Sequence, residues 1–155
     1  MTLSIRAAQA ADAETLAAIY LACRREMSYA PLAHDDAAVR AWFAGALLPA
    51  GGVWLAERGG EIAGFAACSE QDGLLWLDQL YVGARHQGAG IGAALLQRVL
   101  AGRARACRLH VFQANAGARR FYEAHGFTLL SLGDGRDNEE RCPDALYQWR
   151  PDTKE

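Results

Sequence analysis

The residues best suited to chemistry form a glycine-rich run, Gln87-Gly88-Ala89-Gly90-Ile91-Gly92. The run follows a strongly apolar segment, residues 74–82, and precedes a segment whose leucines have helical spacing. Small side chains leave successive backbone N–H groups free to point at one anion, and the positive end of a following helix dipole favours negative charge. The run therefore predicts a phosphate or pyrophosphate site, although glycines at this spacing also make ordinary loops.

A dinucleotide-binding fold is one alternative, because Gly88, Gly90 and Ala93 satisfy the fingerprint G-x-G-x-x-G/A. That fingerprint belongs to a parallel βαβ unit with an acidic residue closing the second strand, whereas residues 108–113 read RLHVFQ. The segments before the loop are joined through Gly59-Gly60, which indicates an antiparallel hairpin. The dinucleotide-binding alternative is therefore disfavoured.

Periodicity and turn residues predict the elements that position the loop. We expect helices that begin at Asp12 and at Asp35 or Asp36, and two more over residues 91–101 and 115–125. Strands are expected at residues 2–6, 53–57, 61–68, 74–82, 107–112, 127–132 and 145–149. The order is β-α-α-β-β-β-α-β-α-β-β, and the nearly continuous apolar run at 74–82 predicts a central strand covered on both faces.

Composition limits the class of protein. A chain of 155 residues with 52% hydrophobic content predicts one domain over residues 1–155. A formal net charge of −2 supplies no general basic field, so we expect no nucleic-acid partner and no membrane partner. Without a leader-like or membrane-spanning apolar segment, a cytoplasmic protein is expected. The four cysteines lack CxxC spacing and the histidines lack metal-ligand spacing, which predicts no metal.

Two motifs together resemble a known family. Gln87-x-x-Gly90-x-Gly92, after Leu80-Tyr81-Val82, looks like the Q/R-x-x-G-x-G/A pyrophosphate loop of the GNAT superfamily of N-acyltransferases. One strand downstream, residues 115–127 read NAGARRFYEAHGF, similar to the superfamily's N-x-x-A-x-x-F-Y-x-x-x-G-F segment. The sequence departs at Gly83-Ala84, where many members carry a proline, and this should loosen the loop slightly without removing a donor.

The resemblance implies an α/β fold of the GNAT type. Its central sheet would be mixed and mostly antiparallel, with a splayed strand pair, and about four helices would flank it. It also implies acetyl-CoA or coenzyme A as co-substrate, with no metal. The implied coenzyme-binding residues comprise the glycine run, the strand edge before it and two residues of the second motif: Leu80, Tyr81, Val82, Gln87, Gly88, Ala89, Gly90, Ile91, Gly92, Asn115 and Arg119. Asn115 also fits a helix N-cap, and Arg119 a solvated helix charge.

Tyr122 and Asp78 are the predicted catalytic residues. The resemblance implies that the Tyr122 hydroxyl protonates the departing coenzyme thiolate, while Phe121 is expected to pack its helix against the sheet. An alkylammonium must lose a proton before it can attack, and Asp78 is a carboxylate in an apolar run, where it is costly unless paired or used. A partnered structural carboxylate at Asp78, Glu26 as the base, and proton removal through water remain alternatives.

The expected reaction is direct acetyl transfer in a ternary complex to a primary amine, either a small molecule or a peptide amine, without an acyl-cysteine intermediate. The acceptor is not specified, although carboxylates after the first helix and in residues 133–143 would suit a cationic amine. A non-catalytic acyl-CoA-binding sensor or scaffold is the alternative function. Self-association into a homodimer stays open.

Overall fold

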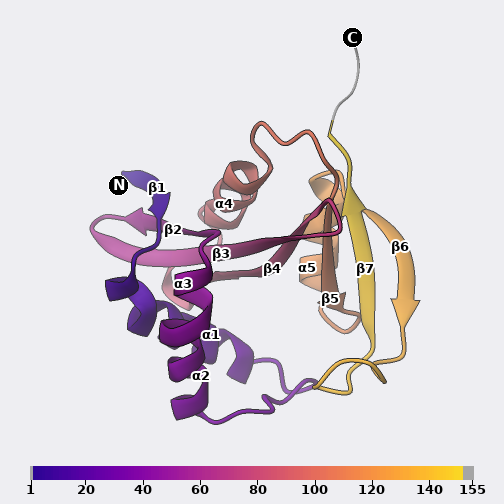
Figure 1. Ribbon diagram of the computed structural model, residues 1–155, viewed down its shortest axis with the longest axis horizontal. Coiled ribbons are helices and arrows are strands. Elements are labelled where there is room, and N and C mark those ends of the chain that lie inside the picture. Colours follow the sequence, from indigo (N-terminus) through magenta and orange to yellow (C-terminus); the bar gives the residue numbers. More distant parts are fainter. Residues whose placement is uncertain (1, 152–155) are drawn as a thin grey trace. The chain divides into compact units, whose positions relative to one another are not determined.

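The computed structural model describes residues 2–151 (Figure 1). Its elements follow the predicted order. In chain order they are β1 (Leu3–Ala7), α1 (Ala13–Arg25), α2 (Asp36–Trp42), α3 (Leu48–Ala50), β2 (Val53–Arg58), β3 (Glu61–Gln71), β4 (Leu74–Val82), α4 (Ile91–Leu100), β5 (Cys107–Phe112), α5 (Ala116–Ala124), β6 (Thr128–Gly133) and β7 (Asp144–Trp149).

The strands form a mixed sheet in the order β1-β2-β3-β4-β5-β7-β6. The pairs β1–β2, β2–β3, β5–β7 and β6–β7 are antiparallel, whereas β4 and β5 run parallel, with Leu75 opposite Cys107. The expected α/β fold class, with a mixed and mostly antiparallel sheet flanked by helices, is confirmed. The splay between two central strands stays a prediction.

The chain divides into two compact units. The first comprises the residues up to Cys68 together with Gln79–Ala101, and the second comprises Ser69–Asp78 together with the residues from Gly102 onwards. Strands β3 and β4 are each divided between the units. A single domain over residues 1–155 stays a prediction, and residues 1 and 152–155 lie outside the described part of the chain.

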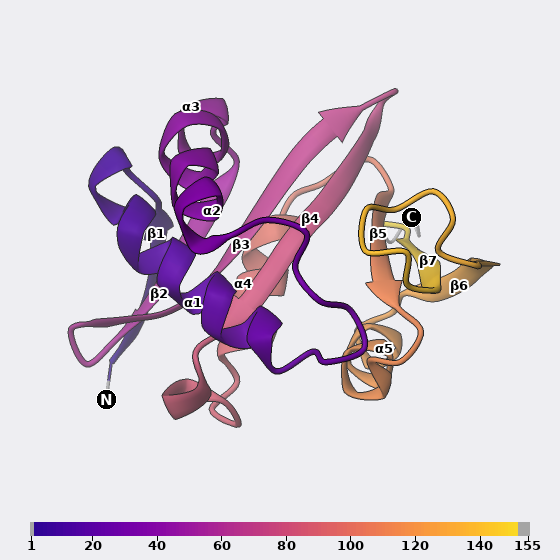
Figure 2. The ribbon, with the colours of Figure 1, turned by 90° about the horizontal axis from the view of Figure 1, so that it is seen from below.

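In the first unit, helices cover both faces of β2 and β3. Figures 1 and 2 show α1 and α2 on one face and α4 on the other. Alternation along β2 explains the two layers, because Leu55 joins the core beneath α1 while Trp54 turns towards α4, where the Arg98 guanidinium lies 4.1 Å from its ring centroid. Leu16, Leu21, Phe43 and Phe65 complete the core beneath α1 and α2.

In the second unit, α5 is fixed to β7 through a buried tyrosine. The Tyr147 hydroxyl donates a hydrogen bond to Glu123 at 2.6 Å and accepts one from Arg119 Nε at 3.0 Å, and both partners lie on α5. Tyr147 is fully buried. These bonds set the rotation of α5 and therefore the direction in which Tyr122 points.

Several turns form as their residues predict, and one expectation is wrong. Gly59 and Gly60 both have positive φ angles, 59° and 84°, in the two-residue turn between β2 and β3. Strand β4 is not covered on both faces: Leu75 and Leu77 are buried, but Asp78 is exposed. Asp12 is the N-cap residue of α1 as expected, but its carboxylate accepts hydrogen bonds from the backbone N–H of Gln9 and from Arg6 rather than from the first turn of α1.

Candidate functional site

The predicted pyrophosphate loop has the backbone of an anion site. Gly88 and Gly90 have φ angles of 82° and 80°, the left-handed region that favours glycine. Gly90 is the N-cap of α4 and, because it has no side chain, it makes no capping hydrogen bond to this helix. The first N–H groups of a helix have no partner within it, so the first turn of α4 offers its donors and the positive end of its dipole outward.

The space beside the loop is open. A Cβ atom built on Gly88 or Gly90 would meet no heavy atom within 4 Å, and Gln87 to Gly90 are exposed. The Gln87 side chain folds back and donates to the Val82 carbonyl at 3.1 Å, which ties the loop to the end of β4. The residues present therefore fit a pyrophosphate held by backbone donors.

The backbone groups of Leu80, Tyr81 and Val82, at the end of β4, point to alternate edges of the strand. The Tyr81 carbonyl faces β3, because a Cβ on Gly64 would lie 2.6 Å from it, and the Gly83 N–H also donates to β3, at the Ala63 carbonyl. Backbone groups alternate along a strand, so Leu80 and Val82 direct theirs to the opposite edge. Of the three predicted residues, Leu80 and Val82 face the edge where an extended ligand can pair. The Val82 carbonyl already accepts hydrogen bonds from Gln87 Nε2 and Cys23 Sγ, so Val82 offers its N–H.

Tyr122 is buried in the second unit. It is 8% exposed, and its ring packs at 5.5 Å from that of Phe127. Phe121 is half-buried, and its ring packs against those of Tyr122 and His125 on the same helix. The Tyr122 hydroxyl makes no hydrogen bond to any residue in the described part of the chain. Burial raises the pKa of Tyr122, with the neighbouring Cys107 thiol adding to the effect, so the phenol keeps its proton at neutral pH.

Asp78 is exposed and has one partner. Its carboxylate accepts a hydrogen bond from Ser69 Oγ at 2.7 Å. Protein atoms around the carboxylate displace water, and this desolvation raises the pKa of Asp78, while the Ser69 bond lowers it by less. A carboxylate with a raised pKa that stays reachable from solvent is chemically suited to accept a proton.

The remaining coenzyme-binding candidates have structural partners as well. Asn115 is the N-cap of α5, and its Oδ1 accepts a hydrogen bond from the Ala118 N–H at 3.1 Å, which confirms the N-cap prediction. Arg119 uses Nε on Tyr147. The Asn115 amide nitrogen and the Arg119 terminal nitrogens make no further hydrogen bond to described residues.

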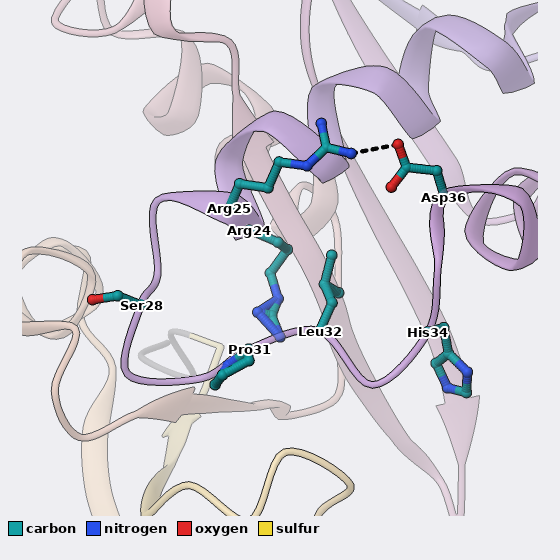
Figure 3. Close-up of a pocket in the computed structure, with 7 residues that line it drawn as sticks. All are labelled: Arg24, Arg25, Ser28, Pro31, Leu32, His34 and Asp36. Carbon is teal, nitrogen blue, oxygen red and sulfur yellow. Dashed lines mark hydrogen bonds and ion pairs between the residues drawn. The ribbon is translucent and has the colours of Figure 1, made fainter.

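A cavity at the end of α1 was not predicted from the sequence. It has a volume of about 330 Å³ and is lined by Arg24, Arg25, Ser28, Pro31, Leu32, His34 and Asp36 (Figure 3). Arg24 is 2% exposed and donates to the Ala30 carbonyl at 3.1 Å, so this arginine shapes the loop after α1. Only its position at the end of an apolar helical stripe could have indicated this role.

The carboxylates around this cavity are engaged. Asp35 caps α2 by accepting from the Ala38 N–H at 2.8 Å, and Asp36 pairs with Arg25. Glu26, the second candidate base, is an exposed C-cap residue of α1 and does not line the cavity. The cationic acceptor suggested by Asp35 and Asp36 and by the carboxylates of residues 133–143 stays a prediction.

The predicted residues therefore fall into two groups. Leu80, Tyr81, Val82 and the loop of residues 87–92 lie together in the first unit, whereas Asp78, Asn115, Arg119 and Tyr122 belong to the second. Within residues 2–151 no group of three or more His, Cys, Asp or Glu side chains is placed to hold a metal ion. Among the same residues, no helix has the length and apolarity that crossing a membrane requires.

Comparison with known proteins identifies the family. Residues 14–127 match the model of the acetyltransferase (GNAT) family, and the chain belongs to this family. No match to a curated protein was found.

Solved structures share the fold. YncA, a putative acetyltransferase from Salmonella typhimurium solved with acetyl-CoA, is 24% identical with a TM-score of 0.74, covering 100% of this chain and 97% of its own. The PaiA N-acetyltransferase from Thermoplasma acidophilum, in complex with coenzyme A, is 19% identical with a TM-score of 0.72, covering 97% and 100%. YjaB from Escherichia coli, in its apo form, is 22% identical with a TM-score of 0.73, covering 96% and 98%.

Proposed function

We propose that this protein is an N-acetyltransferase that moves the acetyl group of acetyl-CoA to a primary amine by direct attack in a ternary complex. The observation that carries the proposal is the uncapped, glycine-built N-terminus of α4, with open space beside Gly88 and Gly90. Membership in the GNAT family and the coenzyme in the YncA and PaiA structures support the same ligand.

The chain's own groups fill the binding roles. The backbone N–H groups of Gly88, Ala89, Gly90, Ile91 and Gly92 hold the pyrophosphate, with Gln87 bracing the loop. Leu80 and Val82 pair with the pantetheine amides, Tyr81 anchors the strand to β3, and the Asn115 amide and the Arg119 terminal nitrogens reach the coenzyme. Acetyl-CoA supplies the activated thioester.

Asp78 and Tyr122 carry out the proton transfers of the proposed reaction. Asp78 takes one proton from the acceptor ammonium and releases it to solvent, which leaves a lone pair that forms the C–N bond as the C–S bond breaks. Tyr122 donates its proton to the leaving sulfur and is reprotonated by the second proton lost from nitrogen. The sum is ammonium plus thioester giving amide, thiol and one proton, with no cysteine acylated.

A non-catalytic acyl-CoA-binding module is the second candidate. It would use the same loop but would not need Tyr122, whose buried side chain has no hydrogen-bond partner within residues 2–151. The proposal further includes a small-molecule or peptide amine as acceptor, a single domain and a cytoplasmic location. Fractionation of cells that express the tagged full chain tests the location.

Tyr122→Phe tests the proposed function. The phenylalanine keeps the ring and its packing on Phe127, so folding and coenzyme affinity should stay nearly unchanged. General acid catalysis contributes about 10² to 10⁴-fold, and single-turnover acetyl transfer at saturating acetyl-CoA should slow by that order. Phe121→Leu, on the half-buried neighbour, is the matched control. Wild-type transfer by Tyr122→Phe would remove Tyr122 from the mechanism.

A further inference from the structure

The face of the second unit's sheet opposite α5 carries an aromatic pair. Cys107 and Leu109 of β5 are buried on the α5 side, so Arg108 and His110 point the other way. Trp76 of β4 is opposite Arg108 in the register and shares this face. The face thus brings together residues from β4 and β5 that the proposed function leaves unused.

Trp76 and His110 stack on each other across the two strands. Their ring centroids are 5.5 Å apart and the ring planes differ by 13°, so the rings lie nearly parallel. The pair is accessible: the His110 side chain is 56% exposed and Trp76 is partly exposed. His110 Nδ1 also lies 3.7 Å from a carboxylate oxygen of Asp144 on β7.

The neighbouring cation is directed away from the rings. Arg108 donates from Nε to Gln148 Oε1 at 2.8 Å, and Gln148 lies opposite it on β7. The guanidinium is thereby drawn towards β7 and away from Trp76. The ring pair remains a flat, mainly apolar surface.

Asp78 lies two residues beyond Trp76 on the same strand and therefore on the same face, about 7 Å further along β4. An amine that gives its proton to Asp78 has its carbon skeleton within reach of the neighbouring side chains on that face. Within the part of β4 that belongs to the second unit, the side chain next to Asp78 on this face is the indole of Trp76.

We propose, resting on the proposed role of Asp78, that Trp76 is an acceptor-recognition residue and that His110 positions its indole. The acceptor class is a primary amine carried on a short chain that ends in a flat apolar or aromatic group. Such a group contacts the Trp76–His110 pair with the offset or edge-to-face geometry that aromatic rings prefer. A polar chain of the same length loses that contact.

Two primary amines test the substrate class, 2-phenylethylamine and ethanolamine, which differ in the group at the end of the chain. Wild type should have the higher kcat/KM for 2-phenylethylamine. An aromatic contact is worth about a three- to tenfold change in affinity, so Trp76→Ala should reduce this preference by that factor, through KM and with kcat unchanged. Trp76→Phe should retain most of it.

Variants of His110 separate positioning from chemistry. His110→Phe keeps a stacking ring and should retain the preference for 2-phenylethylamine. His110→Ala removes the stack and should reduce the preference by about half as much as Trp76→Ala does, on a logarithmic scale. Leu132→Ala removes an exposed apolar side chain (58% exposed) from β6 of the same unit and should leave kcat/KM unchanged for both amines. An unchanged preference in a folded Trp76→Ala protein with wild-type coenzyme affinity overturns the proposal.

A binding measurement keeps this proposal separable from the proposed function. The indole N–H resonance of Trp76, assigned by its loss in Trp76→Phe, should shift when 2-phenylethylamine is added to the coenzyme A complex and should move much less with ethanolamine. A shift without turnover supports the recognition role and contradicts acetyl transfer to this amine. No selective shift contradicts the recognition role, whatever the turnover.

Discussion

Substitution of Gly90 tests the anion site at its most constrained position. Gly90 has a φ angle of 80°, and a residue with a Cβ atom pays about 1–2 kcal/mol there, with more for a β-branched side chain. A domain with about 5–15 kcal/mol of stability survives that loss, so Gly90→Val should fold. The valine should instead relax out of the left-handed region and turn the first N–H groups of α4.

The effect on the coenzyme follows from the donors that move. A hydrogen bond to a charged group contributes about 1.5–3 kcal/mol, so misdirecting one donor should weaken coenzyme A binding by about tenfold to a hundredfold. Isothermal titration calorimetry measures this directly. Gly90→Asn separates the effect of the backbone conformation from steric obstruction by a side chain. Asparagine tolerates the left-handed region, so this variant should lose less affinity for coenzyme A than Gly90→Val.

Controls fix the interpretation. Gly117 lies in the first turn of α5, its φ is not positive, and an added Cβ meets nothing within 4 Å. Gly117→Ala should therefore leave coenzyme affinity unchanged. A Gly90→Val protein that unfolds cooperatively near the wild-type midpoint and binds coenzyme A with an unchanged Kd would refute the loop assignment.

Three further substitutions test the fold and the base. Gly52 has a φ of 77°, and a Cβ atom there would lie 2.2 Å from the Cys68 carbonyl oxygen. Gly52→Ala should therefore lower the free energy of unfolding in urea by about 2–4 kcal/mol, against about 1–2 kcal/mol for Gly51→Ala, whose Cβ would meet no described atom within 4 Å. Equal losses would contradict the steric argument. The hydrogen bond from Arg6 lowers the pKa of Asp12, so the stabilisation that the Asp12 carboxylate gives is present above about pH 4 and is lost as pH falls through the lower folded pKa. Asp12→Asn should therefore be less stable than wild type by about 1–3 kcal/mol at pH 7. Thermal melts check this, because the two proteins should converge in stability at low pH. Because desolvation raises the pKa of Asp78, kcat/KM should rise with pH through a pKa above that of an ordinary aspartate. Asp78→Asn should abolish this rise in the pH profile of kcat/KM. An unchanged profile argues for another base.

Local chemistry made much of the fold predictable. The Gly59-Gly60 turn, the capping by Asn115 and the glycine loop before α4 depend on residues within one or two turns of each other, and all three form as expected. Gly88 and Gly90 need no distant partner to adopt positive φ angles. For that reason the sequence predicted the fold class and the glycine-built start of α4 correctly, while anion binding by this loop stays a prediction.

Only the tertiary structure decided which side chains are covered. The apolar run of β4 predicted burial on both faces, yet Asp78 is exposed while Leu75 is buried, because coverage depends on which helices lie over each face. The same reason makes Tyr122 rather than Phe121 the buried ring, since Tyr147, 25 residues later, sets the rotation of α5. The stack of Trp76 on His110 joins residues more than 30 positions apart, and no periodicity within either strand encodes it. Pairing between distant strands fixes these neighbours, and their contacts determine the chemistry that each face presents.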